Sequence, residues 1–384
     1  MGRKILVSAG EASGDFYASL VVAEIRRRSP SAEFFGCTGP RLRAAGVETV
    51  VDAASLAVVG LLEVVSHIPR IYGEYRKLIR TAEGRRPDLA ILTDSPDFHL
   101  RVARRLKHMG IPVVYLVAPQ AWAWRKGRIP QMRRNLQRLL CIFPFEDEFF
   151  RAHGVAATYI GHPLAGLVAP SLTKDEFFKK HRLAAGRPLI AILPGSRKGE
   201  AVRHLPAVLD AAERLYRERA VNLVLPASAT TGASFFKDLV GSSPVRVIEG
   251  ESWDAMAHAD VALAASGTVT VEAALLGTPM VTYYRVSPPS WVAGKLLVRV
   301  PFYSMVNLVA GRRVVPELMQ SQLTGQALAA EAGRLLSDSA ARAEMCAGLA
   351  DVRRKLGQSG PLSPAAQAAS IVLDILEGQF AHVS

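Results

Sequence analysis

Two segments in the second half of the chain carry residues suited to holding a phosphorylated ligand. The first is Leu193-Pro194-Gly195-Ser196-Arg197, which follows an apolar run and precedes helical spacing from about Glu200. Gly195 lets the backbone approach a ligand closely, free N–H groups at a helix start attract anions, and the planar guanidinium of Arg197 fits phosphate oxygens. A simple strand-to-helix turn with a surface arginine explains this motif equally well.

The second segment is Ser266-Gly267-Thr268, which also follows an apolar run and opens a helical pattern. Its hydroxyls can cap the helix or bind phosphate. Glu272 lies four residues beyond Thr268 and therefore on the same helical face, where a carboxylate can accept hydrogen bonds from ribose hydroxyls. A capped helix with an exposed glutamate is the alternative. A nucleoside diphosphate explains the two anion-binding helix starts together.

Two carboxylates follow a predicted strand in the first half, within Asp94-Ser95-Pro96-Asp97. One of them can deprotonate a hydroxyl nucleophile, a step that contributes roughly 10²–10⁴ in rate. Alternatively, Asp97 only caps the helix predicted from Phe98. The loop Gly10–Asp15 also has two interpretations, because its polar residues are either helix caps or part of a substrate surface.

Alternating strands and helices must position these residues. The predicted strands are Ile5–Ser8, Leu89–Thr93, Val113–Val117, Leu139–Phe143 and Thr158–Ile160, then Leu189–Leu193, Val221–Leu225, Val245–Ile248, Val261–Ala264 and Pro279–Tyr283. Strands separated by helical segments indicate parallel sheets with helices on both faces. Two such series predict an α/β fold of two doubly wound, Rossmann-like domains, residues 1–172 and 173–362. Ligands bind at the carboxyl ends of strands in such sheets, which is where the polar segments stand.

Composition and charge limit the class of protein. The 384 residues are 49% hydrophobic and 21% charged, which excludes a disordered chain or a coiled coil. Lys and Arg number 47 against 34 Asp and Glu, which favours an anionic partner. The three cysteines, Cys37, Cys141 and Cys346, are far apart, so the sequence predicts no disulfide framework, no zinc cluster and a reducing compartment. We also expect no secretory signal and no membrane-spanning helix.

Basic and aromatic residues are interleaved in a way that suits a lipid surface. Ten Lys or Arg and no acidic residue occur from Arg101 to Arg138, and Trp122 and Trp124 lie inside this block. The apolar run upstream, Ala53–Val65, contains Leu61, Leu62 and Val65 and is followed by further basic residues. Indoles beside basic residues are typical of a membrane interface. Core packing and nucleic-acid binding are the alternatives, although no nucleic-acid signature is found.

The ordered set of motifs resembles the bacterial lipid-A-disaccharide synthase family from residue 4 to about 320. The segments that carry the resemblance are Gly10–Asp15, Asp94–Phe98, Trp122–Trp124, Pro144–Glu146, Ile160–Pro163, Leu193–Arg197, Ser266–Thr268 with Glu272, and Asn307–Gly311. Two departures are minor: Ala118-Pro119-Gln120-Ala121 stands where Ser-Pro and other small residues are expected, and Asn307-Leu308-Val309 replaces Asn-Leu-Leu.

The resemblance implies an inverting, metal-independent glycosyltransferase with the GT-B fold and no cofactor. The donor would be UDP-2,3-diacylglucosamine and the acceptor 2,3-diacylglucosamine 1-phosphate, giving a β-1′,6-linked disaccharide 1-phosphate and UDP. The enzyme would be cytoplasmic and associate peripherally with anionic lipids of the inner membrane. A last helix at Ser363–Glu377 would pack back on the first domain.

The resemblance also implies roles for individual residues. Asp97 would be the base, and Arg197 would stabilise the charge on the diphosphate. Glu272 would hold the ribose and Asn307 would contact the donor phosphate or sugar. The remaining assignments are Gly195, Ser196, Ser266, Gly267 and Thr268 for the donor, and Glu11, Ser13, Asp15 and Asp94 for the acceptor side.

Three questions stay open at the level of the sequence. Asp94, Asp97 and Glu11 all remain candidates for the strongest base. A related GT-B enzyme with another UDP-amino sugar and another lipid acceptor is one alternative function. A non-catalytic membrane- or nucleic-acid-binding module is the other, although Asp97, Arg197 and Glu272 together argue against it.

Overall fold

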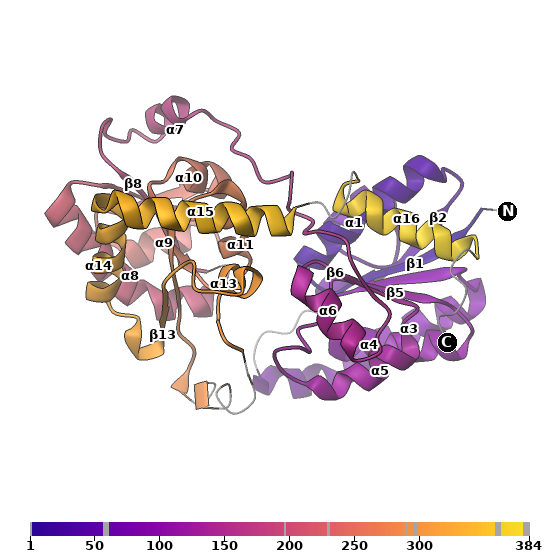
Figure 1. Ribbon diagram of the computed structural model, residues 1–384. Coiled ribbons are helices and arrows are strands. Elements are labelled where there is room, and N and C mark those ends of the chain that lie inside the picture. Colours follow the sequence, from indigo (N-terminus) through magenta and orange to yellow (C-terminus); the bar gives the residue numbers. More distant parts are fainter. Residues whose placement is uncertain are drawn as a thin grey trace. The chain divides into compact units, whose positions relative to one another are not determined.

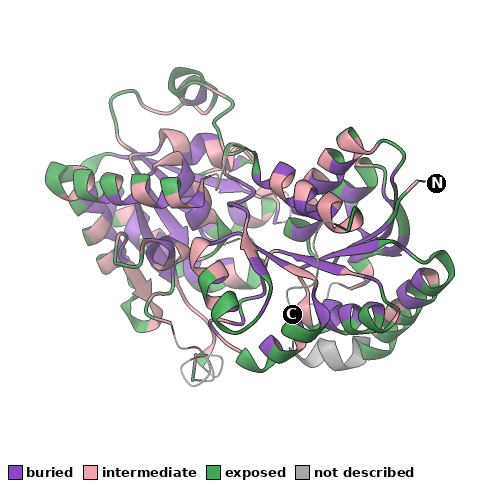
Figure 2. Ribbon diagram, turned by 45° about the vertical axis from the view of Figure 1, so that its right-hand side comes forward, coloured by how far each residue is buried: buried purple, intermediate pink, exposed green. Residues whose placement is uncertain are grey.

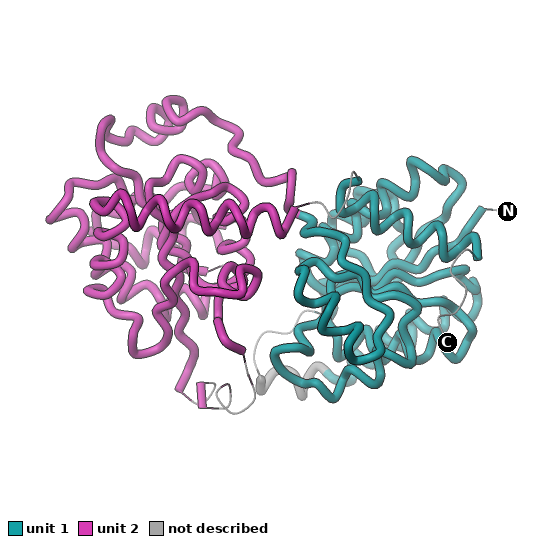
Figure 3. The backbone as a smooth tube through the Cα atoms, in the orientation of Figure 1, with its two compact units in different colours: residues 1–163, 358–384 teal, residues 164–357 magenta. Residues whose placement is uncertain are grey.

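The computed structural model describes residues 2–56, 61–195, 197–228, 231–288, 291–292, 294, 298, 300–357 and 362–378, without the side chains of 61–67. The chain forms two compact units, coloured separately in Figure 3: residues 1–163 with 358–384, and residues 164–357. The first boundary between the units therefore falls after Pro163, whereas the sequence analysis placed it after residue 172.

Unit 1 is built on seven parallel strands in the order β3-β2-β1-β4-β5-β6-β7. The order reverses between β1 and β4, and β4 is buried at every position because helices cover both faces of the sheet. The strands are β1 (Lys4–Ala9), β2 (Glu33–Thr38), β3 (Glu48–Asp52), β4 (Leu89–Thr93), β5 (Val113–Leu116), β6 (Arg138–Cys141) and β7 (Ala157–Tyr159).

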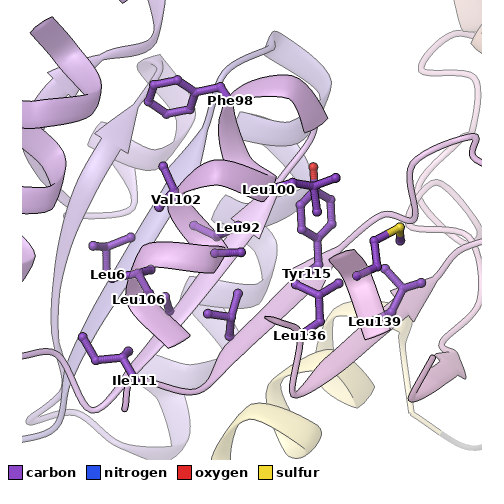
Figure 4. Close-up of a cluster of buried hydrophobic side chains, with 14 of the residues drawn as sticks. Leu6, Leu92, Phe98, Leu100, Val102, Leu106, Ile111, Tyr115, Leu136 and Leu139 are labelled. Carbon is purple, nitrogen blue, oxygen red and sulfur yellow. The ribbon is translucent and has the colours of Figure 1, made fainter. Parts of the chain in front are cut away.

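The helices of unit 1 lie on the two faces of this sheet (Figure 1). They are α1 (Ala12–Arg28), α2 (Pro40–Ala44), α3 (Leu61–Arg85), α4 (Pro96–His108), α5 (Ile129–Asn135), α6 (Pro144–Ala152) and α16 (Pro364–Leu376), with 3-10 turns η1 (Ala53–Ser55) and η2 (Lys126–Arg128). A buried cluster that includes Leu6, Leu92, Leu106 and Tyr115 fills the space between α4 and the strands (Figure 4). Its apolar side chains fix α4, and therefore the loop that precedes it, against the sheet.

The last helix packs on the first one. Helix α16 contacts α1, and the Arg28 guanidinium donates to Ser370 Oγ at 2.6 Å and to the Ala366 carbonyl at 3.1 Å. The chain thus returns to unit 1 after completing unit 2.

Unit 2 repeats the architecture with six parallel strands in the order β10-β9-β8-β11-β12-β13. The order reverses between β8 and β11, and Figure 2 shows the strands of both units as largely buried. The strands are β8 (Leu189–Leu193), β9 (Asn222–Ala227), β10 (Arg246–Glu249), β11 (Val261–Ala265), β12 (Met280–Tyr284) and β13 (Glu317–Met319). The helices are α7 (Lys174–Lys180), α8 (Lys198–Arg219), α9 (Ala233–Val240), α10 (Ser252–His258), α11 (Thr268–Leu276), α13 (Met305–Ala310), α14 (Gly325–Ser337) and α15 (Ser339–Leu356), with the 3-10 turn η3 (Gln320–Gln322).

The predicted fold class is confirmed, since both sheets are parallel and doubly wound. All ten predicted strands exist, and β4 and β8 have the predicted bounds. Strands β2, β3 and β13 were not predicted; β13 has only three residues, and β2 contains Gly36, a residue type that is uncommon inside strands. None of the helices in the described part of the chain has the length and apolarity needed to cross a bilayer.

Candidate active site

The end of β4 places Asp94 at the point in unit 1 where the strand order reverses. Asp94 and Ser95 have φ angles of 54° and 35°, a left-handed conformation that is costly for residues with a side chain. Three contacts support this turn. The Tyr115 hydroxyl and His99 Nδ1 (3.0 Å) both donate to the Asp94 carbonyl, and His99 Nε2 lies 2.7 Å from Ser8 Oγ. The surrounding core therefore holds Asp94 in a strained conformation.

The carboxylate of Asp94 joins the ends of β4 and β1. Its Oδ1 accepts the Gly10 amide at 2.8 Å and its Oδ2 accepts the Glu11 amide at 3.0 Å. A Cβ atom at Gly14 would lie 1.8 Å from Oδ2, so a side chain there is incompatible with this arrangement. Gly14, in the first turn of α1, is thus required because the Asp94 carboxylate approaches its backbone closely.

Burial changes the acid–base behaviour of Asp94. It raises the pKa of Asp94 from 3.8 to about 7, although the amides of Gly10 and Glu11 act in the opposite direction. Burial also lowers the pKa of His99 to about 4, so this ring is neutral near pH 7 and donates through Nδ1 to the Asp94 carbonyl. A carboxyl group that titrates near pH 7 is suited to general base catalysis.

Asp97, three residues further on, has the opposite environment. It stands in the first turn of α4 with a side chain that is 74% exposed. Its carboxylate accepts from Arg125 Nη1 at 2.8 and 3.1 Å and from Arg128 Nη2 at 2.5 Å. Partial burial raises the pKa of Asp97, but the hydrogen bonds and charges of the two arginines outweigh that effect and lower it overall. Asp97 is therefore a weaker base than Asp94.

The other residues assigned to the acceptor side lie in the β1–α1 loop. Glu11 is the exposed N-cap of α1, and Ser13 is exposed in its first turn. The Asp15 carboxylate is buried and accepts the amides of Gly39 (2.7 Å), Arg41 (2.8 Å) and Leu42 (3.2 Å). Asp15 thus caps α2, which is the structural alternative that the sequence left open.

In unit 2 the two segments predicted to bind phosphate, Leu193–Arg197 and Ser266–Thr268, follow β8 and β11. These strands are neighbours at the reversal of strand order. Gly195 has a φ of 117°, which favours glycine. Ser196 lies outside the described residues. Arg197 is the N-cap of α8, and its side chain is 74% exposed with Nη1 2.9 Å from Glu200 Oε1. Glu200 also accepts the Tyr284 hydroxyl at 3.1 Å, so it orients Arg197 from the end of β12.

A histidine that the sequence analysis did not identify fixes the β8–α8 loop. His204 Nδ1 lies 2.8 Å from the Pro194 carbonyl, and its Nε2 accepts the Arg285 amide at 3.0 Å. The ring therefore carries its proton on Nδ1 and ties the loop to the end of β12. The sequence points to this role only in that His204 is a polar residue on the apolar face of α8.

The second motif opens α11. Ser266 Oγ donates to the Tyr303 carbonyl at 3.0 Å, while Gly267, the N-cap, and Thr268 are exposed. One turn into the helix, Glu272 Oε2 accepts the indole N–H of Trp253 at 3.1 Å. Burial raises the pKa of Glu272, and the bond from Trp253 partly offsets that effect. The exposed helix start and the oriented carboxylate stand together as the spacing predicted.

Asn307 has a structural position rather than an open one. It is fully buried, and its Nδ2 donates at 2.9 Å both to the Val315 carbonyl and to Glu317 Oε1. Its Oδ1 accepts the amides of Val314 at 2.7 Å and Val315 at 3.0 Å. These four bonds use the donors and acceptors of the side chain, so the structure does not place Asn307 where a donor substrate could bind it directly.

The residues predicted to face lipid have different surroundings. Trp122 packs against the core and donates its indole N–H to the buried Glu146 at 3.0 Å, so it faces inward. Trp124 is half-buried beneath the guanidinium groups of Arg125 and Arg128. Leu61, Leu62 and Val65 belong to α3, but their side chains lie outside the described residues.

Glu146 is a second buried acid, to which the sequence analysis assigned no role. It accepts the Ile142 and Phe143 amides at 3.3 and 3.2 Å, and burial raises its pKa to about 8. Its position, three residues into α6 after Phe143, is the signal of a capping glutamate.

Metal coordination has no candidate ligand set in the part of the chain that is described. No three His, Cys, Asp or Glu side chains gather there in a way that would hold an ion. Metal-independent transfer stays a prediction.

Comparisons with known proteins cover nearly the whole chain. The model of the family described as "Lipid-A-disaccharide synthetase" matches residues 5–372. A lipid-A-disaccharide synthase of Solibacter usitatus is 72% identical over 381 residues, covering 99% of this chain and 100% of the relative. That of Koribacter versatilis is 44% identical, covering 97% and 99%. Among solved structures, the calicheamicin glycosyltransferase CalG4 aligns with a TM-score of 0.62 at 17% identity over 99% of this chain and 100% of that one, which supports the GT-B fold.

Proposed function

The chain belongs to the lipid-A-disaccharide synthase family, and from that premise we propose the substrates and the residues of its reaction. As a member of this family it is a UDP-sugar-dependent glycosyltransferase of lipid A biosynthesis. The proposed donor is UDP-2,3-diacylglucosamine and the proposed acceptor 2,3-diacylglucosamine 1-phosphate. The acceptor 6-hydroxyl displaces UDP from the sugar C1 with inversion, which forms the β-1′,6 bond.

Asp94 is the proposed base for this displacement, in place of Asp97. The observation that carries the proposal is the position of Asp94 at the reversal of strand order, with a pKa raised to about 7. At pH 7 about half of such carboxyl groups are ionised and able to accept a proton, and the raised pKa makes proton uptake more favourable than for an ordinary aspartate. Asp97 is bound by two guanidinium groups that lower its pKa, and this makes proton uptake less favourable.

The diphosphate of the donor is proposed to bind the two helix starts of unit 2. Arg197 is exposed at the start of α8, and Gly267 and Thr268 are exposed at the start of α11. Guanidinium and backbone N–H groups stabilise the negative charge that grows on the leaving diphosphate. Glu272, oriented by Trp253, accepts hydrogen bonds from the ribose hydroxyls in this arrangement.

Asp94→Asn and Asp97→Asn separate the two possible bases. With Asp94 as the base, Asp94→Asn lowers kcat roughly 10²–10⁴-fold and keeps UDP affinity. The wild-type rate falls about tenfold for each pH unit below about 7, because only the ionised carboxylate accepts the proton. Asp97→Asn retains this dependence on pH. Near-normal turnover of Asp94→Asn, together with a large loss in Asp97→Asn, would return the role of base to Asp97.

Two experiments address the alternative functions. Competition between acylated donor and UDP-GlcNAc tests the related GT-B enzyme, since a diacyl-sugar transferase uses the unacylated donor poorly. Release of UDP from the acylated donor, dependent on acceptor, tests the non-catalytic module. A protein that binds UDP but never releases it from donor contradicts the proposed reaction.

A peripheral position on the cytoplasmic face of the inner membrane is the proposed location. Ile68 and Tyr72 of α3 are 54% and 57% exposed, and Arg70 and Arg76 on the same helix are exposed as well. Apolar side chains beside cations suit an anionic lipid surface. Replacing Ile68 and Tyr72 with Ser is expected to release the protein from vesicles that contain phosphatidylglycerol. Unchanged retention, with the fold intact by circular dichroism, contradicts this surface.

A further inference from the structure

We propose that Arg125 and Arg128 form the binding site for the phosphate group of the acceptor, with the carboxylate of Asp97 occupying that site in the absence of substrate. The inference rests on the proposed function, because it identifies the group that recognises the phosphorylated end of the acceptor sugar.

The arrangement is that of an anion site. Two guanidinium groups converge on one carboxylate, at 2.8 Å from Arg125 Nη1 and 2.5 Å from Arg128 Nη2. Among the residues that the structure describes, no other acceptor is within hydrogen-bond distance of either guanidinium. Each guanidinium carries five N–H donors, so most of the donors and one net positive charge remain available to a ligand.

Trp124 holds the two cations in place. The guanidinium carbons of Arg125 and Arg128 lie 4.4 and 5.7 Å from the centre of its indole ring. Cation–π attraction limits the freedom of both side chains, so less entropy is lost when they bind an anion. Arg125 has a φ of 56°, and its backbone conformation directs the start of η2.

The site is open to a ligand on the side of Asp97. The side chains of Asp97 and Arg125 are 74% and 47% exposed, whereas Arg128 is 14% exposed. A phosphate monoester carries more charge than a carboxylate and offers three terminal oxygens to the planar donors of arginine. It can therefore displace the exposed carboxylate, which turns toward solvent, while the more buried Arg128 stays as an anchor.

The pair lies near the proposed base. Asp97, whose carboxylate binds both guanidinium groups, follows Asp94 by only three residues in the chain. In a hexopyranose C1 and C5 flank the ring oxygen; C1 carries the anomeric phosphate, and C5 carries the exocyclic carbon C6 with the 6-hydroxyl. An acceptor whose 6-hydroxyl reaches Asp94 therefore presents its phosphate about one ring width away, in the neighbourhood of Arg128.

The test compares two acceptors that differ only in the phosphate. Initial rates are measured in mixed detergent micelles with 2,3-diacylglucosamine 1-phosphate and with 2,3-diacylglucosamine, for wild type and for Arg125→Gln, Arg128→Gln and the double variant. Because charge-assisted hydrogen bonds are the stronger class, wild type is expected to favour the phosphorylated acceptor by about 10²-fold in kcat/KM. The double variant is expected to lose this preference through KM and to use the unphosphorylated acceptor as wild type does.

Arg133→Gln is the matched control, because Arg133 belongs to the same basic segment but does not contact Asp97. It is expected to keep the preference. Equal losses on both acceptors in the double variant overturn the proposal, since they indicate a role in folding or in the chemistry. A preference that survives both substitutions overturns it as well.

Two further measurements complete the test. The first distinguishes the acceptor phosphate from the phosphate of a lipid headgroup, and the second distinguishes failure of this inference from failure of the proposed function. Co-sedimentation with phosphatidylglycerol vesicles is expected to be equal for the double variant and Arg133→Gln. A selective loss in the double variant, with the acceptor preference intact, assigns the site to a lipid headgroup and overturns the proposal. Equal use of the two acceptors by wild type refutes only this inference, whereas transfer to neither acceptor refutes the proposed function.

Discussion

Replacing Asp94 with Asn is expected to make the protein more stable at alkaline pH while it removes activity. Burial raises the pKa of Asp94 from 3.8 to about 7, and its side chain is only 12% exposed. Each pKa unit corresponds to 1.36 kcal/mol, so the ionised carboxylate costs the folded state about 4 kcal/mol at pH above 7. An asparagine carries no charge and avoids this cost.

The sign of the pH dependence follows from proton binding. Between pH 3.8 and about 7 the folded state binds more protons at Asp94 than the unfolded state does, so this group lowers stability as the pH rises. The wild type is expected to lose about 2–3 kcal/mol from this source between pH 5 and pH 8. The variant loses none of it, although at every pH one of the Gly10 and Glu11 amides is left with a poorer partner, which costs about 1–3 kcal/mol.

Urea unfolding at pH 5 and pH 8 measures this difference. A background with Trp253→Phe and Trp291→Phe leaves Trp122 and Trp124 as fluorescence reporters of unit 1. The free energy of unfolding of Asp94→Asn relative to wild type should be about 2–3 kcal/mol more favourable at pH 8 than at pH 5. Asp97→Asn is the control: because the pKa of Asp97 is lowered from 3.8, its carboxylate is ionised in both the folded and unfolded states from pH 5 to pH 8, so its difference from wild type should be the same at both pH values. A difference between Asp94→Asn and wild type that is the same at both pH values would refute the assignment of a raised pKa.

Two further predictions concern donor binding and structural caps. Arg197→Ala is expected to raise the Kd for UDP at least about tenfold in calorimetry, whereas Lys198→Ala, at the neighbouring position, changes it little; an equal effect of both contradicts a specific phosphate contact. Asp15→Ala and Asn307→Ala are each expected to lower the free energy of unfolding by about 2–4 kcal/mol, because each leaves buried amides without an acceptor, and to leave UDP affinity unchanged. A weaker UDP affinity in folded Asn307→Ala would restore that side chain to the donor site.

The positions of the sheet and of the helix starts follow from local sequence. Runs such as Leu89–Thr93 and Leu189–Leu193 are apolar throughout because both faces of a parallel sheet are covered, so their bounds were predicted correctly. The motifs with Gly195 and Gly267 stand at adjacent strand ends, as the rule for open sheets predicts. These features depend on neighbours in the chain, which a single sequence displays.

The properties of single side chains depend on distant parts of the chain. Asp94 and Asp97 look alike in sequence, but the Gly10 amide and the core burial act on one, whereas Arg125 and Arg128 bind the other. Asp15, Asn307 and Trp122 looked like functional residues, yet amides and a carboxylate from other elements use their polar atoms. The sequence by itself determined the fold class, the family and the polar loops at the strand ends. Only the tertiary structure decided which carboxylate is buried with a raised pKa and which is held by two arginines, because desolvation and ion pairing arise from residues brought together by folding.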